Sequence, residues 1–212
     1  IYEETSANMP SQAWKRARHN QPWYAGDTIS IGIGQGYWTA TPLQIALSTS
    51  VLANEGNFFE PKLLKAIETS TGRIQSPAQD RPPVVIDDQS NWQVVKQAMY
   101  NTVNTPTGTA FKAFSGTTYN AAGKTGTAQV ISIAQDAEYD ETKINERHRD
   151  NALFVGFAPY DNPKVVVAIV VENAGGGSSM AAPIARAMLD AYFDANPIQQ
   201  QTLSDLPLAG AP

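Results

Sequence analysis

Residues 121–130 read Ala-Ala-Gly-Lys-Thr-Gly-Thr-Ala-Gln-Val, and this stretch decides both the fold class and the candidate chemistry. A cation, Lys124, precedes Thr125 and Thr127, with Gly126 between the two hydroxyls. An ammonium and hydroxyls at one strand edge can hold a carboxylate, and a glycine lets a ligand backbone lie close to the strand. The backbone N–H of Thr127 could donate to an oxyanion. Taken alone, the tripeptide favours the ordinary interpretation, an exposed edge lysine beside two strand threonines.

Three strands are predicted in this half of the chain, at 122–133, 152–158 and 165–172. Only residues 159–164 join the last two, and a parallel return needs about a dozen residues, so these strands are predicted to be antiparallel neighbours. A final helix is predicted over 181–194. Its apolar residues recur at helical spacing and predict one face packed on the sheet, made of Ile184, Ala187, Met188, Ala191 and Tyr192.

The first clear helix upstream begins at a capping box. Thr41 is the N-cap, Pro42 the first helical residue and Gln44 the reciprocal partner, and Gly56 is the predicted stop. Residues 1–36 lack sustained periodicity and are predicted to be irregular, with an aromatic loop around 22–27.

A hairpin and a second helix are predicted between these regions. Residues 62–69 and 73–76 flank a Ser-Thr-Gly turn, which is typical of a strand pair. Asp87 or Asp88 can cap a helix that ends before Thr105. Its predicted inward face is made of Trp92, Val95, Met99 and Val103.

Composition excludes several classes of protein. The 212 residues contain 42% hydrophobic residues, enough for a packed core, and the formal charge of -5 is the wrong sign for a nucleic-acid partner. The longest apolar run, 165–171, is far shorter than the roughly 20 residues of a membrane-spanning helix. Without cysteine there is no disulfide, thiolate nucleophile or thiolate metal site, which fits cytosol and periplasm equally.

Other candidate sites are weaker. The two histidines, His19 and His148, lie in polar stretches and are predicted to be surface residues. This argues against a Ser-His-Asp triad, which needs a histidine buried against a carboxylate. Residues 136–147 imitate the start of a calcium loop but have Glu141 at the glycine position and Arg147 at the glutamate position. The alternating glycines at 32–36 fall short of a dinucleotide fingerprint. No metal and no cofactor are predicted.

The Lys-Thr-Gly tripeptide becomes informative through its context. Lys-Thr-Gly is a signature element of penicillin-binding proteins and serine β-lactamases, and here it precedes two further strands and a helix. Upstream, residues 34–44 contain Gly-Gln-Gly and Thr-Pro-Leu-Gln in the order typical of class B penicillin-binding proteins. With Pro-Trp-Tyr at 22–24, Gly-Asp-Thr at 26–28 and the glycines at 175–177, the chain resembles that family over most of its length.

The resemblance implies an α+β fold, the penicillin-binding-protein/β-lactamase-like transpeptidase fold, in which helices flank a central antiparallel sheet. It implies a periplasmic D,D-transpeptidase at the inner membrane that cross-links peptidoglycan stem peptides and is acylated by β-lactams. Lys124, Thr125 and Gly126 would bind the terminal carboxylate of the donor peptide, and the N–H of Thr127 would join the oxyanion hole. A SEDS-family glycan polymerase is the implied partner.

Two motifs of that family have no match in this chain. No serine is followed three residues later by lysine, so the nucleophile is expected outside the chain. Ser6-Ala7-Asn8 spells the second motif but leads into Met-Pro instead of an apolar helix, and we interpret it as a coincidence. The absence of an initiator methionine likewise suggests a piece. We therefore expect residues 1–196 to be the C-terminal part of a transpeptidase domain, inactive alone, and 197–212 a flexible tail.

Three alternatives stay open on sequence alone. A β-lactam-sensing receptor domain shares the fold and a similar strand, a serine β-lactamase is a further enzyme class, and a purely structural module is the simplest. The segment at 34–44 favours a cell-wall synthase over the first two, and the composition of 124–127 argues against the third. The charged stretch at 134–150 is unassigned and could border the site.

Overall fold

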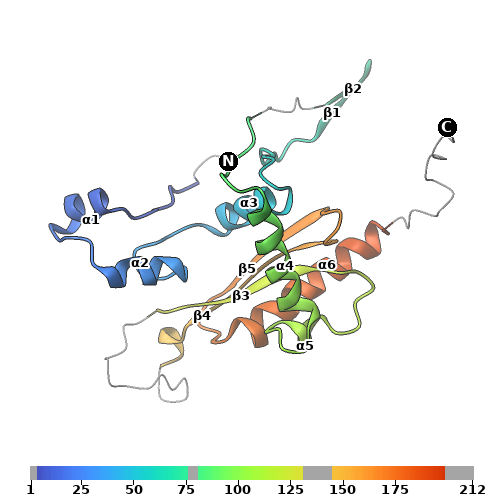
Figure 1. Ribbon diagram of the computed structural model, residues 1–212. Helices are drawn as coiled ribbons and strands as arrows, with labels where there is room; N and C mark the ends of the chain where they lie inside the picture. The colour runs from blue at the N-terminus through green and yellow to red at the C-terminus, as the bar shows by residue number, and fades with distance from the viewer. Residues whose placement is uncertain (1–3, 76–80, 131–144, 199–212) are drawn as a thin grey trace, which may run out of the picture.

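The computed structural model describes residues 4–75, 81–130 and 145–198. In chain order the elements are α1 (Gln12–His19), α2 (Ala25–Gly32), α3 (Pro42–Ala53), β1 (Ala66–Thr69), β2 (Gly72–Gln75), α4 (Ser90–Asn104), α5 (Phe111–Phe114), β3 (Ala122–Ala128), the 3-10 turn η1 (Glu146–His148), β4 (Asn151–Ala158), β5 (Val165–Val171), the π-turn η2 (Gly177–Ala181) and α6 (Ala182–Ala195). Figure 1 shows α1 and α2 extending to one side as an arm and the β1–β2 hairpin projecting from the body.

The centre of the molecule is an antiparallel sheet in the order β3-β4-β5. Lys124 pairs with Val155, Thr125 with Phe154 and Phe154 in turn with Ile169, so these pairs alternate between the two faces of the sheet. β3 pairs only with β4 among the described residues, which leaves its other edge open. The predicted antiparallel arrangement is confirmed.

Helices cover both faces of this sheet. Phe154 and Val167 point into a core shared with Phe114 of α5 and Leu189 of α6. The opposite face packs on α3 and α4 through a smaller cluster of Ala53, Met99, Ala122 and Phe157. The predicted α+β class, with helices flanking an antiparallel sheet, is confirmed.

Helix α3 begins as its sequence predicts. Thr41 Oγ1 accepts from the Gln44 backbone N–H at 3.2 Å, and Gln44 Oε1 accepts from the Thr41 N–H at 2.9 Å. Each side chain satisfies a backbone donor that the first helical turn leaves unpaired. Gly56, with φ of 97°, follows the end of the helix in the left-handed region, as expected of a stop.

The buried face of α4 differs from the predicted one by one residue. Met99 and Val103 are buried as expected, but Val95 is 44% exposed and Lys96 is buried in its place. Lys96 Nζ donates to Glu55 Oε1 at 2.7 Å, and this bond lowers the pKa of the Glu55 carboxyl. Because the partner comes from the end of α3, the periodicity of α4 alone could not reveal that a lysine faces inward.

The predicted packing face of α6 is wrong. The helix buries Ala182, Ala185, Leu189 and Phe193, whereas Ile184, Met188 and Tyr192 of the predicted face are 42%, 51% and 36% exposed. Both stripes have helical spacing, so hydropathy could not choose between them. The stripe with Ala182 and Ala185 is the one that packs on the sheet, because small side chains let the helix lie close to it. Ala187 and Ala191, the other two residues of the predicted face, are exposed.

The prediction that residues 1–36 are irregular is also wrong. Ser11 caps α1 by accepting from the Trp14 N–H at 3.1 Å, and Lys15 Nζ donates to Asp27 Oδ2 of α2 at 2.5 Å. That bond, with a second one from the Tyr24 N–H, lowers the pKa of the Asp27 carboxyl. Each of these helices has only eight residues, which is too short to show a sustained apolar repeat in the sequence.

The remaining local predictions are largely confirmed. β1 and β2 form the predicted hairpin, with Ile67 opposite Ile74, and His19 and His148 are both exposed. β3 ends at Ala128, earlier than predicted, and 131–133 lie outside the described residues. So do 134–144 of the charged stretch, most of the calcium-like segment, and 199–212 of the predicted tail. Within the parts described, no helix combines the length and hydropathy that crossing a bilayer requires.

Tyr119 ties the segment before β3 to α6. Its hydroxyl donates to Asp190 Oδ1 at 2.7 Å, and Arg186 Nε donates to the other oxygen of Asp190 at 3.0 Å. Burial and the bond to Asp190 raise the pKa of the Tyr119 hydroxyl above its ordinary value. The neutral phenol is therefore the form that this contact stabilises.

Replacing Tyr119 by phenylalanine should lower the free energy of unfolding by about 1 kcal/mol, the net value of one hydrogen bond. The contribution should be complete below about pH 10, because the unfolded tyrosine loses its proton there first, and should shrink at higher pH. Urea unfolding of the wild type and Tyr119→Phe, near pH 8 and about pH 10.5, would measure the difference between their free energies of unfolding. The same difference in the free energy of unfolding at both pH values would contradict this account.

Candidate active site

The predicted site residues lie together on β3 at the open edge of the sheet. Lys124 and Thr127 are exposed, and Thr125 and Gly126 are half-buried. The pairing of Gly126 with Leu153 holds this part of the strand on β4. The backbone of β3 is therefore held on one side by β4, and along its other side no strand of the described residues pairs with it.

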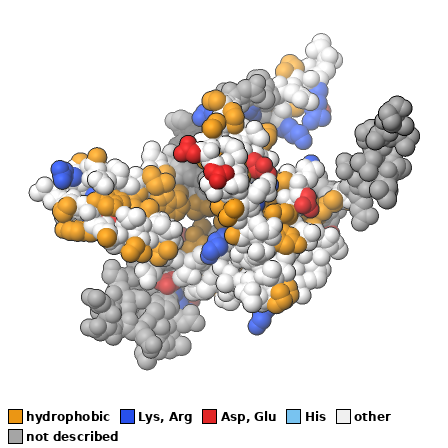
Figure 2. Space-filling view, viewed as in Figure 1, with side chains coloured by type: hydrophobic (Ala, Val, Ile, Leu, Met, Phe, Trp, Pro, Cys, Tyr) orange, Lys and Arg blue, Asp and Glu red, His pale blue; other side chains and the backbone are white. Residues whose placement is uncertain are grey.

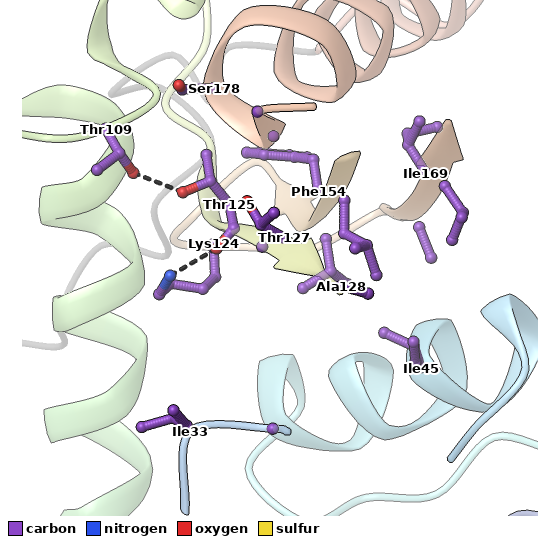
Figure 3. A pocket seen from close by; sticks show the side chains of 18 of the residues that line it. Ile33, Ile45, Thr109, Lys124, Thr125, Thr127, Ala128, Phe154, Ile169 and Ser178 are labelled. Carbon is purple, nitrogen blue, oxygen red and sulfur yellow. Dashed lines mark hydrogen bonds between the residues drawn. The ribbon is translucent and has the colours of Figure 1, made fainter. Parts of the chain in front are cut away.

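Lys124 is positioned to receive an anion. Its Nζ donates to the Thr125 carbonyl at 2.5 Å, a bond drawn in Figure 3. Among the described residues no carboxylate forms an ion pair with it. Within the described parts of the chain this backbone carbonyl is the partner of the ammonium, which keeps its other donors available for an incoming carboxylate.

The Thr125 hydroxyl is held by a second threonine. Thr109, which lies between α4 and α5, approaches it with 2.8 Å between the two Oγ1 atoms. Figure 3 shows the two side chains pointing toward each other beside Lys124. Sequence reasoning missed Thr109, since nothing in its local pattern indicates that it faces a strand residue.

A cavity of about 670 Å³ lies beside this edge, between the sheet and the segment that joins α2 to α3. Lys124 to Thr127 line one side, and Ile33, Trp38 and Ile45 line the other. Figure 3 shows Ile33 and Ile45 across from the strand, and Figure 2 shows hydrophobic side chains around a hollow beside the arm. An apolar cavity with convergent polar groups is the usual form of a small-ligand site.

Gly177 of η2 packs directly against the backbone of β3 and β4 beside the site. A Cβ at this position would lie 2.4 Å from the carbonyl oxygens of both Gly126 and Leu153. The π-turn η2 can therefore reach the β3–β4 pair only with glycine here. The sequence places a glycine run at 175–177, but the run alone does not tell which member makes the close approach.

Gln35 is a further residue at the site that sequence reasoning did not assign. Its side-chain Nε2 donates to the Thr127 carbonyl at 2.9 Å, across 92 positions of sequence. The two glycines that flank it are the only local signal, because they indicate a tight turn that presents the side chain between them.

Among the residues that the structure describes, the serines do not complete a nucleophilic site. Ser178 lines the cavity, but Ala181 stands three residues after it, where a lysine would be needed. Ser6 and Asn8 do not line the cavity, and Asn8 pairs with Thr39 through backbone hydrogen bonds. The geometry thus supplies an anion-binding lysine, an open strand edge and a cavity, which together can bind an extended chain ending in a carboxylate.

Comparison with known proteins agrees with this geometry. The family model described as the penicillin binding protein transpeptidase domain matches residues 2–190. The peptidoglycan D,D-transpeptidase MrdA of Haemophilus influenzae is 48% identical over 197 residues, which are 92% of this chain and 30% of the relative. The chain thus spans less than a third of that relative's length.

Solved structures give the same result. A crystal structure of PBP2 from Pseudomonas aeruginosa in complex with WCK 5153 superposes with a TM-score of 0.76 and 38% identity, covering 98% of this chain and 42% of that one. PBP2 from Helicobacter pylori in complex with MreC gives a TM-score of 0.74 and 29% identity, covering 93% and 33%. With the family model matching most of its length, this chain belongs to the penicillin-binding protein transpeptidase family.

Proposed function

We propose that the protein containing this chain is a serine-type peptidoglycan D,D-transpeptidase that cross-links stem peptides and is acylated by β-lactams. The observation that carries the proposal is the open edge of β3, where Lys124 lies beside an apolar cavity without a carboxylate partner among the described residues. The names of the similar proteins support a cell-wall synthase over a receptor domain or a β-lactamase.

Each residue of the strand has a proposed task. Lys124 and the Thr125 hydroxyl bind the terminal carboxylate of the donor peptide. Gly126 lets that peptide lie against the strand, and the Thr127 N–H donates to the carbonyl oxygen as it becomes an oxyanion. These groups bind and polarise the substrate; they do not themselves form the covalent bond.

The covalent step requires a serine from outside this chain. Its oxygen attacks the penultimate D-Ala carbonyl, the C–N bond to the terminal D-Ala breaks, and the leaving amine takes up a proton. An amino group of a second stem peptide then attacks the acyl-enzyme, restoring the serine and forming the cross-link. No cofactor takes part in this scheme.

The domain, its location and its partners follow as further proposals. Residues 1–196 form the C-terminal part of the transpeptidase domain, a division supported by the end of α6 at Ala195. The exposed Ile184, Met188 and Tyr192 of α6 are then a surface for the upstream part of the domain. The protein acts at the periplasmic face of the inner membrane with a SEDS-type polymerase, and the MreC complex of the Helicobacter protein supports a place in a wall-synthesis assembly.

Intact mass spectrometry after incubation with a reactive penicillin tests the proposed function. We expect a single penicilloyl adduct on the full-length protein and none on residues 1–212 alone, because the nucleophile lies outside this chain. The full-length protein denatured before incubation is the control for nonspecific acylation. An adduct on the isolated chain would place the nucleophile among its own serines, and no adduct on the native full-length protein would remove the transpeptidase assignment.

A further inference from the structure

Gln35 is presented to the site by a rigid turn. Gly34 and Gly36 adopt φ values of +77° and +76°, in the left-handed region that favours glycine. The Gly34 N–H donates to the Ile31 carbonyl at 2.9 Å and the Gln35 N–H to the Ser30 carbonyl at 2.8 Å. The turn is therefore tied to the last residues of α2, and its backbone fixes where the Gln35 side chain starts.

The Gln35 side chain ends on the open edge of β3. Nε2 donates to the Thr127 carbonyl at 2.9 Å, and two residues earlier the Thr125 carbonyl accepts from Lys124. In an antiparallel edge strand, alternate residues direct both N–H and C=O away from the partner strand. Thr125 and Thr127 are such a pair, so Gln35 occupies one of the backbone acceptors that the open edge offers.

A primary amide on a strand edge imitates a peptide. An extended ligand adds to an edge strand by donating its own N–H to an outward carbonyl. The Gln35 amide makes the same bond to the same atom, so both cannot use that lone-pair direction at once. A ligand with an N–H replaces the Gln35 hydrogen bond to the Thr127 carbonyl by its own. A ligand without an N–H leaves the Gln35 amide bonded to that carbonyl.

We propose that Gln35 is a specificity-determining residue that acts as a stand-in for the ligand's backbone N–H at Thr127. It keeps the edge carbonyl satisfied in the free enzyme and beneath ligands that lack a donor. It thereby reduces the advantage of ligands that carry an acylamino N–H. This role rests on the proposed function, because it requires that the ligand of the transpeptidase site lies along β3.

Replacing Gln35 by methionine in the full-length protein tests this role. Methionine is of similar length and has no N–H donor, so the Thr127 carbonyl would be left unpaired beneath a ligand that lacks a donor. The measurement is the ratio of second-order acylation rate constants for benzylpenicillin, which carries an acylamino N–H, and for penicillanic acid, which does not. We expect Gln35→Met to raise this ratio about three- to tenfold, the value of one neutral hydrogen bond.

Controls separate this role from a structural one. Gln35→Glu keeps the size of the side chain but loses the donor, so it should raise the ratio as well, and Gln21→Met, at an exposed position, should leave it unchanged. In a crystal structure of the wild-type acyl-enzyme with benzylpenicillin, Gln35 Nε2 should lie beyond hydrogen-bond distance of the Thr127 oxygen.

An unchanged ratio, with both rates lowered equally, would make Gln35 a merely structural residue and overturn the proposal. A lowered ratio would mean that Gln35 bonds to the acylamino ligand directly, which also overturns it. Failure of the wild type to be acylated by either compound would instead count against the proposed function.

Discussion

Gly177→Ala is expected to destabilise the transpeptidase domain by about 3 kcal/mol or more, at the upper end of the cost of overpacking a core. The added methyl would lie 2.4 Å from two backbone carbonyl oxygens, one on Gly126 of β3 and one on Leu153 of β4. Side-chain repacking cannot relieve a clash with backbone on two paired strands. The π-turn η2 must move away from the sheet or the strand pair must part.

The neighbouring glycine offers a matched control. A Cβ on Gly176 would approach only the Ser179 hydroxyl, at 3.3 Å, and its φ of -84° suits any residue. Gly176→Ala should therefore change the free energy of unfolding by under about 1 kcal/mol.

Thermal unfolding of the two full-length variants decides the matter. Gly177→Ala should melt several degrees below the wild type, and Gly176→Ala should melt close to it, since the shift in melting temperature follows the loss of stability. Because Gly126 belongs to the site strand, acylation by penicillin should also slow in Gly177→Ala when measured below its melting temperature. Equal melting temperatures for the two variants would show that η2 tolerates a side chain here.

Lys124→Met is expected to slow acylation of the full-length protein by a β-lactam about 10- to 100-fold, the value of one hydrogen bond to a charged group. The proposed partner of Lys124 is the ligand carboxylate, so the loss should depend on that group. Lys124 is exposed, so the melting temperature should change little.

The methyl ester of the same penicillin separates carboxylate binding from other roles. The wild type should be acylated more slowly by the ester than by the acid, and Lys124→Met should be acylated by the two at similar rates. Lys65→Met removes an exposed cation next to β1 and should behave as the wild type. A variant that loses the same factor with acid and ester would assign Lys124 a role other than carboxylate binding.

What the sequence predicted correctly is local. The α3 helix is specified by three neighbouring residues, Thr41, Pro42 and Gln44, whose hydrogen bonds close within one turn. The antiparallel pairing of β4 with β5 follows from the short connection at 159–164. Family membership follows from short motifs in a fixed order, since these need no knowledge of how distant segments meet.

Errors arose where a residue's environment comes from another element. Val95 and Lys96 are adjacent on α4, and only Glu55 at the end of α3 explains why the lysine is the buried one. α6 carries two apolar stripes, and only its packing on the sheet selects the one that contains Leu189. α1 and α2 are joined by Lys15 and Asp27, a contact that hydropathy does not record.

The candidate site shows the same division. The sequence by itself determined the family and the fold class, through short motifs that resemble those of the family, and it located the strand that carries Lys124 to Thr127. Only the tertiary structure decided that Thr109 and Gln35 meet this strand and that Gly177 must be glycine. The physical reason is that close packing and long-range hydrogen bonds depend on which surfaces the folded chain brings together. Contacts between residues that are far apart in the sequence leave no local pattern from which they could be predicted.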